Sequence, residues 1–247
     1  ALASISPRGV EQYEQASYSL AEQAMGDPGV RAHIVPCQPQ FITDMNCAAA
    51  FVQAFGRQVW RRPLQPEEIS VLVDIAMSAI EVRGDFYLGL EYAIAALLQS
   101  PNFLFRTELG SAGAFDNYEM ASRLSYFFWN TTPDEQLLDA AALGVLTTDD
   151  GLREQALRLL DSPRTRAGVR NMFSEIYRLH ALDQLSKDPM LFEHMSPEVG
   201  PAAREETLMG IEHIVFDLDG DFRNIYNTRT TFLNRKLASI YNVRAPT

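Results

Sequence analysis

The sequence predicts an all-α protein, a compact orthogonal multi-helix bundle in two packed subdomains. Helix caps and apolar residues at helical spacing recur along most of the chain. Strands of alternating polarity bounded by turn residues are missing, and the sequence shows no low-complexity tract and no repeat of about 20 to 50 residues. Because a helical solenoid needs such a repeat, we expect the helices to pack into a compact bundle.

Four helices are expected before residue 101, each begun by a capping residue or an early proline. The first runs from Ser6-Pro7 to Gly26, the second starts at Asp44, the third runs from about Pro66 to Gly84, and the fourth runs from Asp85 to Leu98. Between the first two helices, the segment that carries His33 and Cys37 contains prolines and polar turn residues, so it is expected to be a loop.

The best internal boundary is the stretch LGSAGAFD at 109–116, which is small, contains glycine and shows no periodicity. We therefore expect an N-terminal helical subdomain over 1–110, which includes the loop with both cysteines. A C-terminal helical subdomain is expected over 111–247.

Further helix signals follow this boundary at short intervals. A capping box of Asp116 and Glu119 starts a helix that ends near Trp129. The remaining starts and ends are expected at Thr132 to Gly144, Asp149 to Leu160, Ser162-Pro163 to His180, Ser196-Pro197 to Phe216, and Thr231 onward. Short loops join these helices.

Composition and charge exclude several classes of protein. The formal net charge is -11 and no basic stripe is present, so nucleic acid is not an expected partner. No apolar run approaches the roughly 18 residues of a membrane span, so no transmembrane segment is expected in this chain. Only Lys187 and Lys236 are lysines, and the many arginines suit internal ion pairs, although a GC-rich genome would give the same composition.

The two cysteines do not form a metal or haem motif. Nine residues lie between Cys37 and Cys47, so the pair is neither C-x-x-C nor C-x-x-C-H, and no further Cys/His set for zinc is near. The pair is therefore a disulfide or two free thiols, and the composition of the loop favours the disulfide. A bond would place the protein in an oxidising compartment. No cofactor is expected within this chain.

Four charged residues form a candidate buried ionic network: Arg106, Glu108, Arg123 and Glu206. Arg123 follows Met120 by three residues and precedes Phe127 by four, so it is expected on the apolar face of its helix, where its charge needs a partner. A buried ionic lock between the subdomains is favoured over a pocket for an anionic or sugar ligand. No metal site is expected, because Glu206 and His213 are seven residues apart on one helix.

Four segments carry a family resemblance: RQVWRRPLQPEEISVLV, LLQSPNFLFRTELG, YEMASRLSYFFWNTTPDEQLLDAAALGVL and TFLNRKLASIYNV. The chain resembles, from Cys37 onward, the central helical domains of large exported bacterial proteins of unknown function, often associated with cytochrome-c-like haem domains. The recurring positions match Arg62, Pro63, Ser100, Pro101, Arg106, Glu108, Arg123, Ser125, Trp129, Pro133 and Asp134. The resemblance assigns no catalytic role, and it implies a disulfide between Cys37 and Cys47 and a longer exported polypeptide.

We therefore expect a non-catalytic helical scaffold or interaction module of a larger periplasmic or extracellular protein. Its expected partners are other domains or subunits of that assembly, which the resemblance links to haem electron transfer. The alternative is an extracytoplasmic enzyme, hydrolase or oxidoreductase, that acts on a polymer such as a polysaccharide. Its carboxylates would come from Glu108, Glu206 and Asp134. Catalytic residues are not identified by the sequence.

Overall fold

The computed structural model describes residues 6–110, 113–188 and 190–245, which form helices and connecting segments without a β-strand. The predicted all-α class is confirmed. The chain divides into two units, each described by itself below: unit 1 comprises Ala1–Ser125 and Thr132–Gln155, and unit 2 comprises Tyr126–Thr131 and Ala156–Thr247.

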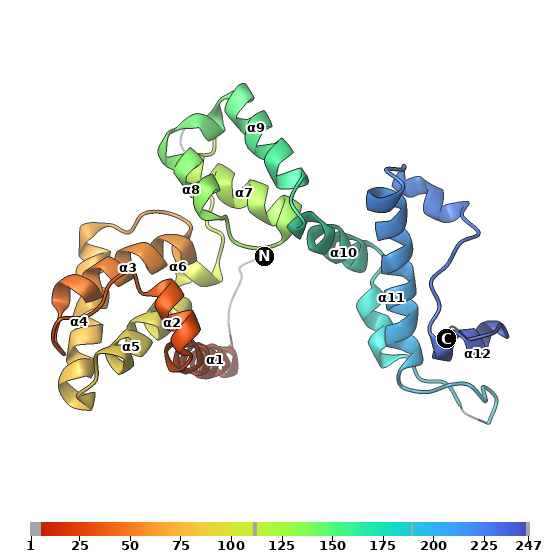
Figure 1. Cartoon of the computed structure of the whole chain (residues 1–247), viewed down its shortest axis with the longest axis horizontal. Coiled ribbons are helices and arrows are strands. Elements are labelled where there is room, and N and C mark those ends of the chain that lie inside the picture. Colours follow the sequence, from red (N-terminus) through yellow and green to blue (C-terminus); the bar gives the residue numbers. More distant parts are fainter. Residues whose placement is uncertain (1–5, 111–112, 189, 246–247) are drawn as a thin grey trace. The chain divides into compact units, whose positions relative to one another are not determined.

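Unit 1 contains the helical segments up to residue 104 and two further elements between residues 135 and 147 (Figure 1). They are α1 Pro7–Gly26, α2 Pro28–Ile34, α3 Met45–Trp60, α4 Pro66–Arg83, α5 Phe86–Gln99, α6 Pro101–Leu104, α8 Glu135–Ala142 and the 3-10 turn η1 Val145–Thr147. The division between the units runs through α7 Asn117–Trp129 and α9 Asp149–Leu160.

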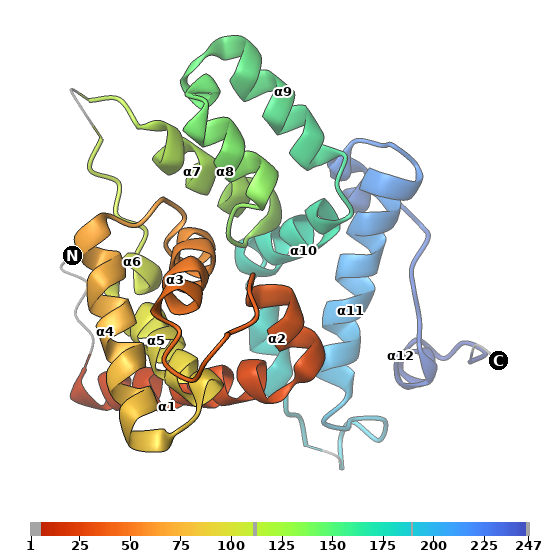
Figure 2. The ribbon, with the colours of Figure 1, turned by 60° about the vertical axis from the view of Figure 1, so that its left-hand side comes forward.

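The core of unit 1 is built around α5, which packs against α1, α3 and α4. Figure 2 shows α1, α4 and α5 side by side from a second direction. The side chains of Leu90, Ala93 and Leu97 are fully buried on α5, which accounts for the strongly apolar sequence of this helix. Gly89 lets α5 approach α4 closely, because a Cβ there would clash with the Ile80 side chain and lie 2.7 Å from the Ala76 carbonyl.

Unit 2 contains the remaining helical segments. They are α10 Arg164–Ile176, the 3-10 helix η2 Leu179–Gln184, α11 Val199–Glu212, the π-helix η3 His213–Asp217, the 3-10 helix η4 Phe222–Tyr226 and α12 Arg235–Tyr241. A small core joins α10, η2 and α11 through Phe173, Leu179, Leu208 and Ile211.

Most predicted helix starts are correct, because the capping side chains form the expected bonds. Ser6 accepts from the Gly9 N–H, Asp44 from Cys47 and Asp85 from Tyr87 and Leu88. In the first helix, however, the buried face carries Ser17, Ala21 and Met25. The large apolar side chains of Val10, Tyr13 and Leu20 face solvent instead.

Several element predictions are wrong, and local capping explains most of the differences. The helix expected from Ser196-Pro197 to Phe216 starts at Val199 and continues after Glu212 as a π-helix. The segment with His33 is the helix α2, since Asp27 caps it by accepting from Gly29 and Val30. Asp134, not Thr132, caps α8. The helix toward His180 ends at Ile176 and gives way to a 3-10 helix. The last helix starts at Arg235, where Asn234 caps it.

The expected subdomain division at residue 110 stays a prediction. Ser111 and Ala112, in the middle of the boundary segment, lie outside the described residues. A disulfide joins Cys37 and Cys47, as the sequence and the resemblance favoured. Within the described ranges, none of the helices is both long and apolar enough to cross a membrane.

Candidate functional site

The candidate site begins where α3 ends, at a residue with a left-handed backbone. Arg61 is the C-cap of α3 with φ 61°, a conformation that glycine or asparagine usually fills. Its guanidinium donates to the backbone carbonyls of Asn102, Phe103 and Phe105, and also to that of Val59. These carbonyls lie at helix ends, where they lack partners within the helix. The buried Arg61 side chain therefore joins the end of α3 to the segment around α6.

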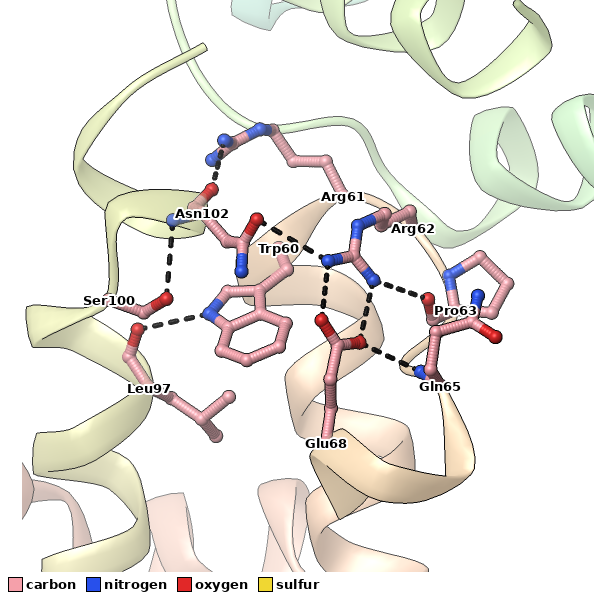
Figure 3. Close-up of polar contacts among 9 residues, drawn as sticks. All are labelled: Trp60, Arg61, Arg62, Pro63, Gln65, Glu68, Leu97, Ser100 and Asn102. Carbon is pink, nitrogen blue, oxygen red and sulfur yellow. Dashed lines mark hydrogen bonds and ion pairs between the residues drawn. The ribbon is translucent and has the colours of Figure 1, made fainter. Parts of the chain in front are cut away.

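Arg62 makes a second and different connection (Figure 3). Its two terminal nitrogens bind the two carboxylate oxygens of Glu68, each at 2.8 Å, and one of them also reaches the Asn102 side-chain oxygen at 3.3 Å. The guanidinium lies 5.4 Å from the centre of the Trp60 ring. Because Arg62 donates to Glu68, the pKa of Glu68 is lowered and that of Arg62 is raised.

The same carboxylate also starts α4. Glu68 accepts from the backbone N–H of Gln65 at 2.8 Å, so it occupies the N3 position of a capping box. On the other side, the indole N–H of Trp60 donates to the Leu97 carbonyl, and Ser100 caps α6 by accepting from the Asn102 N–H. Figure 3 shows these side chains converging between α3, α4 and the α5–α6 corner. The corner is therefore held by side-chain contacts from several elements.

A second acidic residue, Glu119, fixes the chain that leaves this corner. The Glu119 carboxylate accepts from the backbone N–H groups of Leu109, Gly110 and Asp116, at 2.7, 2.8 and 2.8 Å. Asp116 in turn accepts from the Glu119 N–H, which completes the predicted capping box. The pKa of Glu119 is lowered because its carboxylate accepts these hydrogen bonds, with that from Gly110 the largest contribution. One side chain thus ties both ends of the 110–116 segment to α7.

A cavity of about 330 Å³ lies among these groups within unit 1. Aromatic side chains of Trp60, Phe105 and Tyr118 contribute to its lining. Its charged lining residues are Arg61, Arg62, Arg106, Glu108, Asp116 and Glu119. Ligand pockets combine apolar walls with a few placed polar groups and span about 300 to 1,000 Å³. The cavity has this composition and lies at the lower end of that range.

A second hollow in unit 1 differs in character. It follows the outer face of α4, and its lining includes Val71, Ile75 and Val82. Val71 and Val82 are largely exposed, and Asp74 and Arg83 are the charged residues of the lining. Because convergent polar groups mark ligand sites, the cavity beside Trp60 is the better candidate.

The predicted pair of Arg123 and Glu108 forms, with a distance of 2.8 Å between Nη1 and Oε2. The side chains are 46% and 29% exposed, so the pair is not the buried lock that the sequence suggested. α7 buries Ala121, Ser125 and Trp129, whereas Phe127 on the face of Arg123 is 77% exposed. Such surface pairs contribute about 0 to 1 kcal/mol.

The other predicted site residues lie in different surroundings. Arg106 lines the cavity beside Glu108. Glu206 belongs to unit 2, where its carboxylate accepts from the hydroxyl groups of Thr231 and Tyr241. Asp134 serves as the cap of α8. A single network that includes Arg106 and Glu206 stays a prediction.

Sequence reasoning missed most of the residues that shape the cavity. Arg61, Trp60, Asn102 and Glu119 were assigned no site role, although Glu119 was recognised as part of a capping box. A usable signal was the pair of arginines between the end of a helix and a proline, where a left-handed residue is expected. In the part of the chain that the structure describes, no group of three or more His, Cys, Asp or Glu residues could hold a metal ion.

Comparison with family models gives two matches. Residues 115–243, just over half of the chain, match the model PSD4, a protein of unknown function (DUF1592). Residues 47–108 match PSD5, a protein of unknown function (DUF1595). No curated protein and no solved structure matches the chain.

Proposed function

We propose that this chain, which belongs to the PSD4 family of proteins of unknown function (DUF1592), is a non-catalytic helical interaction module of a larger extracytoplasmic protein. One observation carries the proposal. The carboxylates that line the cavity are each already engaged in holding the structure: Glu108 with Arg123, Asp116 as the cap of α7, and Glu119 with three backbone N–H groups.

Acid catalysis requires a carboxyl group that is protonated and free to donate its proton, whereas the carboxylates of this cavity accept hydrogen bonds from the protein. A general acid at neutral pH needs a raised pKa, and hydrolysis of glycosidic bonds uses a pair of carboxyl groups of which one is protonated. The Glu119 carboxylate has a lowered pKa because it accepts N–H groups. Such a group is suited to fixing a wall of the cavity and not to donating a proton.

The disulfide supports the extracytoplasmic part of the proposal. Disulfides persist mainly in oxidising compartments, and Cys37 and Cys47 are bonded. The disulfide therefore supports the periplasmic or extracellular location that we propose. The association with haem-carrying domains is a more specific part of the proposal, and its support is the sequence resemblance.

The division into subdomains over 1–110 and 111–247 belongs to the same proposal. The two family matches support it, because one ends at residue 108 and the other begins at 115. The expected partners are other domains or subunits of the larger assembly.

The alternative function is an enzyme that acts on a polysaccharide, and the aromatic and acidic lining of the cavity favours it. The engaged state of the carboxylates favours the non-catalytic module. The two candidates differ in what Glu108 does: an enzyme uses its carboxylate in the reaction, whereas the module uses it to pair with Arg123.

An assay of reducing ends separates the candidates. The full chain with its disulfide intact is incubated with xylan, laminarin and carboxymethyl cellulose, in parallel with Glu108→Gln and, as a control, Glu67→Gln. We expect no release above the buffer blank for any of the three proteins. Release by the wild type that Glu108→Gln abolishes and Glu67→Gln preserves would overturn the non-catalytic proposal.

A further inference from the structure

We infer that the cavity beside Trp60 is a binding site for a neutral saccharide, a hydroxyl-rich ring that contacts Phe105 and hydrogen-bonds to the polar groups around it. The inference rests on the proposed function, because it names what the module binds. Its first support is the balance of charge in the cavity. Three arginines and three carboxylates line it, so the formal charge of the lining is zero.

This balance disfavours charged ligands. An anion would lie near Glu108, Asp116 and Glu119, of which Glu119 is kept ionised by its N–H partners. A cation would lie near three guanidinium groups. Burying a charge without a partner is unfavourable, whereas a neutral polar ligand can bond to groups of either sign. The lining therefore favours a ligand that is uncharged and rich in hydroxyl groups.

The aromatic residues add the second support. Phe105 is 37% exposed, and Trp60 and Tyr118 line the same cavity. A sugar ring has faces of C–H groups that can pack on aromatic rings, while its hydroxyl groups point outward to polar partners. Asn102, Thr107 and Ser122 in the lining supply neutral donors and acceptors for those hydroxyls. Apolar faces and polar edges are thus present together.

The third support is that the walls are fixed by contacts within the protein. Glu68 holds Arg62, four carbonyls hold Arg61, and Glu119 holds the backbone at 109, 110 and 116. A pocket whose walls are already ordered loses little conformational entropy on binding. Weak polar contacts with a sugar can then yield measurable affinity.

Calorimetric titration of the full chain with intact disulfide tests this inference. The neutral probes are maltohexaose, cellohexaose and xylohexaose, and trigalacturonate and a chitosan oligomer are the anionic and cationic probes. We expect at least one neutral probe to bind with a Kd of about 1 mM or tighter, and both charged probes to bind more weakly. Phe105→Ala should weaken the neutral probe about tenfold, because it removes an aromatic contact surface.

Phe41→Ala is the matched control, because Phe41 is an exposed phenylalanine of unit 1 that lies outside the cavity lining. It should leave the Kd unchanged. The inference would be overturned if no neutral probe bound at concentrations up to about 10 mM, tenfold above the expected Kd. Equal weakening of binding by both variants would overturn it too. In either case the proposed function would stand. Binding of a neutral probe followed by its cleavage would support the ligand class and overturn the non-catalytic function.

Discussion

Arg61 and Arg62 are neighbours in the sequence but have different electrostatic partners. The left-handed backbone of Arg61 directs its side chain to backbone carbonyls at helix ends, whereas Arg62 forms a bidentate pair with Glu68. Bidentate arginine and carboxylate pairs are among the stronger hydrogen-bonded contacts in proteins. The number of charges in this segment therefore does not reveal its contacts, because one guanidinium binds backbone carbonyls and the other binds a carboxylate.

The Glu68 carboxylate should contribute measurably to the stability of unit 1. We expect Glu68→Gln to lower the free energy of unfolding by about 1 to 2 kcal/mol, because it weakens two charge-assisted bonds and the cap of α4. The measurement is urea unfolding followed by the fluorescence of Trp60 in a Trp129→Phe background, where Trp60 is the remaining tryptophan.

Glu67→Gln is the control for that substitution, because Glu67 is the exposed neighbour in the same first turn of α4. The difference between the two variants should shrink at acid pH. The folded pKa of Glu68 is lowered from 4.5, so its contribution is present above that value and is lost as the pH falls through the lowered pKa. Equal stabilities of both variants at pH 7 would show that the pair is solvated.

At the scale of the elements, capping residues in the sequence predicted the starts of the longer helices, but the two short helices α2 and α6 were not predicted. Ser6, Asp44 and Asp85 accept the bonds that their positions suggested. The helices α2 and α6 were missed because 7 and 4 residues are too few to show an apolar stripe. Their signals were a capping side chain followed directly by proline, at Asp27-Pro28 and Ser100-Pro101.

The contact of α4 with α5 depends on one glycine. We expect Gly89→Ala to lower the free energy of unfolding by about 1 to 3 kcal/mol, since the added Cβ would meet Ile80 and the Ala76 carbonyl. Gly26→Ala, in which the Cβ has nothing within 4 Å, is the matched control and should leave stability unchanged or raise it slightly. Urea unfolding of both variants gives the comparison, and a stable Gly89→Ala protein would mean that the helices lie farther apart.

At the scale of the whole molecule, polar groups are satisfied within the protein. Among the described residues, every buried side-chain nitrogen or oxygen has a hydrogen-bond partner. The many arginines predicted internal ion pairs, but the buried charge was expected at Arg123, whose side chain is 46% exposed. Helix periodicity places a residue on a face, yet the face that is buried is decided by packing partners far away in the sequence. For the same reason the cavity, built from α3, α6, α7 and the segments between them, was expected only as the less favoured alternative to an ionic lock.

The disulfide should stabilise the whole of unit 1. Its cysteines are 10 residues apart, and closing such a loop stabilises the fold by about 2.5 kcal/mol. We expect this loss of unfolding free energy in the Cys37→Ser, Cys47→Ser double variant, measured by urea unfolding. The wild type in dithiothreitol should show the same loss, and the double variant should not respond to the reductant. Unchanged stability on reduction would contradict a structural role for the bond.

The most direct test of a cavity whose carboxylates are committed to structure is the titration of Glu119. Its side-chain carboxyl carbon can be followed by NMR in the full chain labelled with ¹³C-glutamate, and the signal missing from Glu119→Gln identifies it. We predict a midpoint below the ordinary pKa of 4.5, because the carboxylate accepts from three backbone N–H groups. A midpoint above 4.5 would contradict the account, since it would show a carboxyl group that retains its proton and is available for acid catalysis.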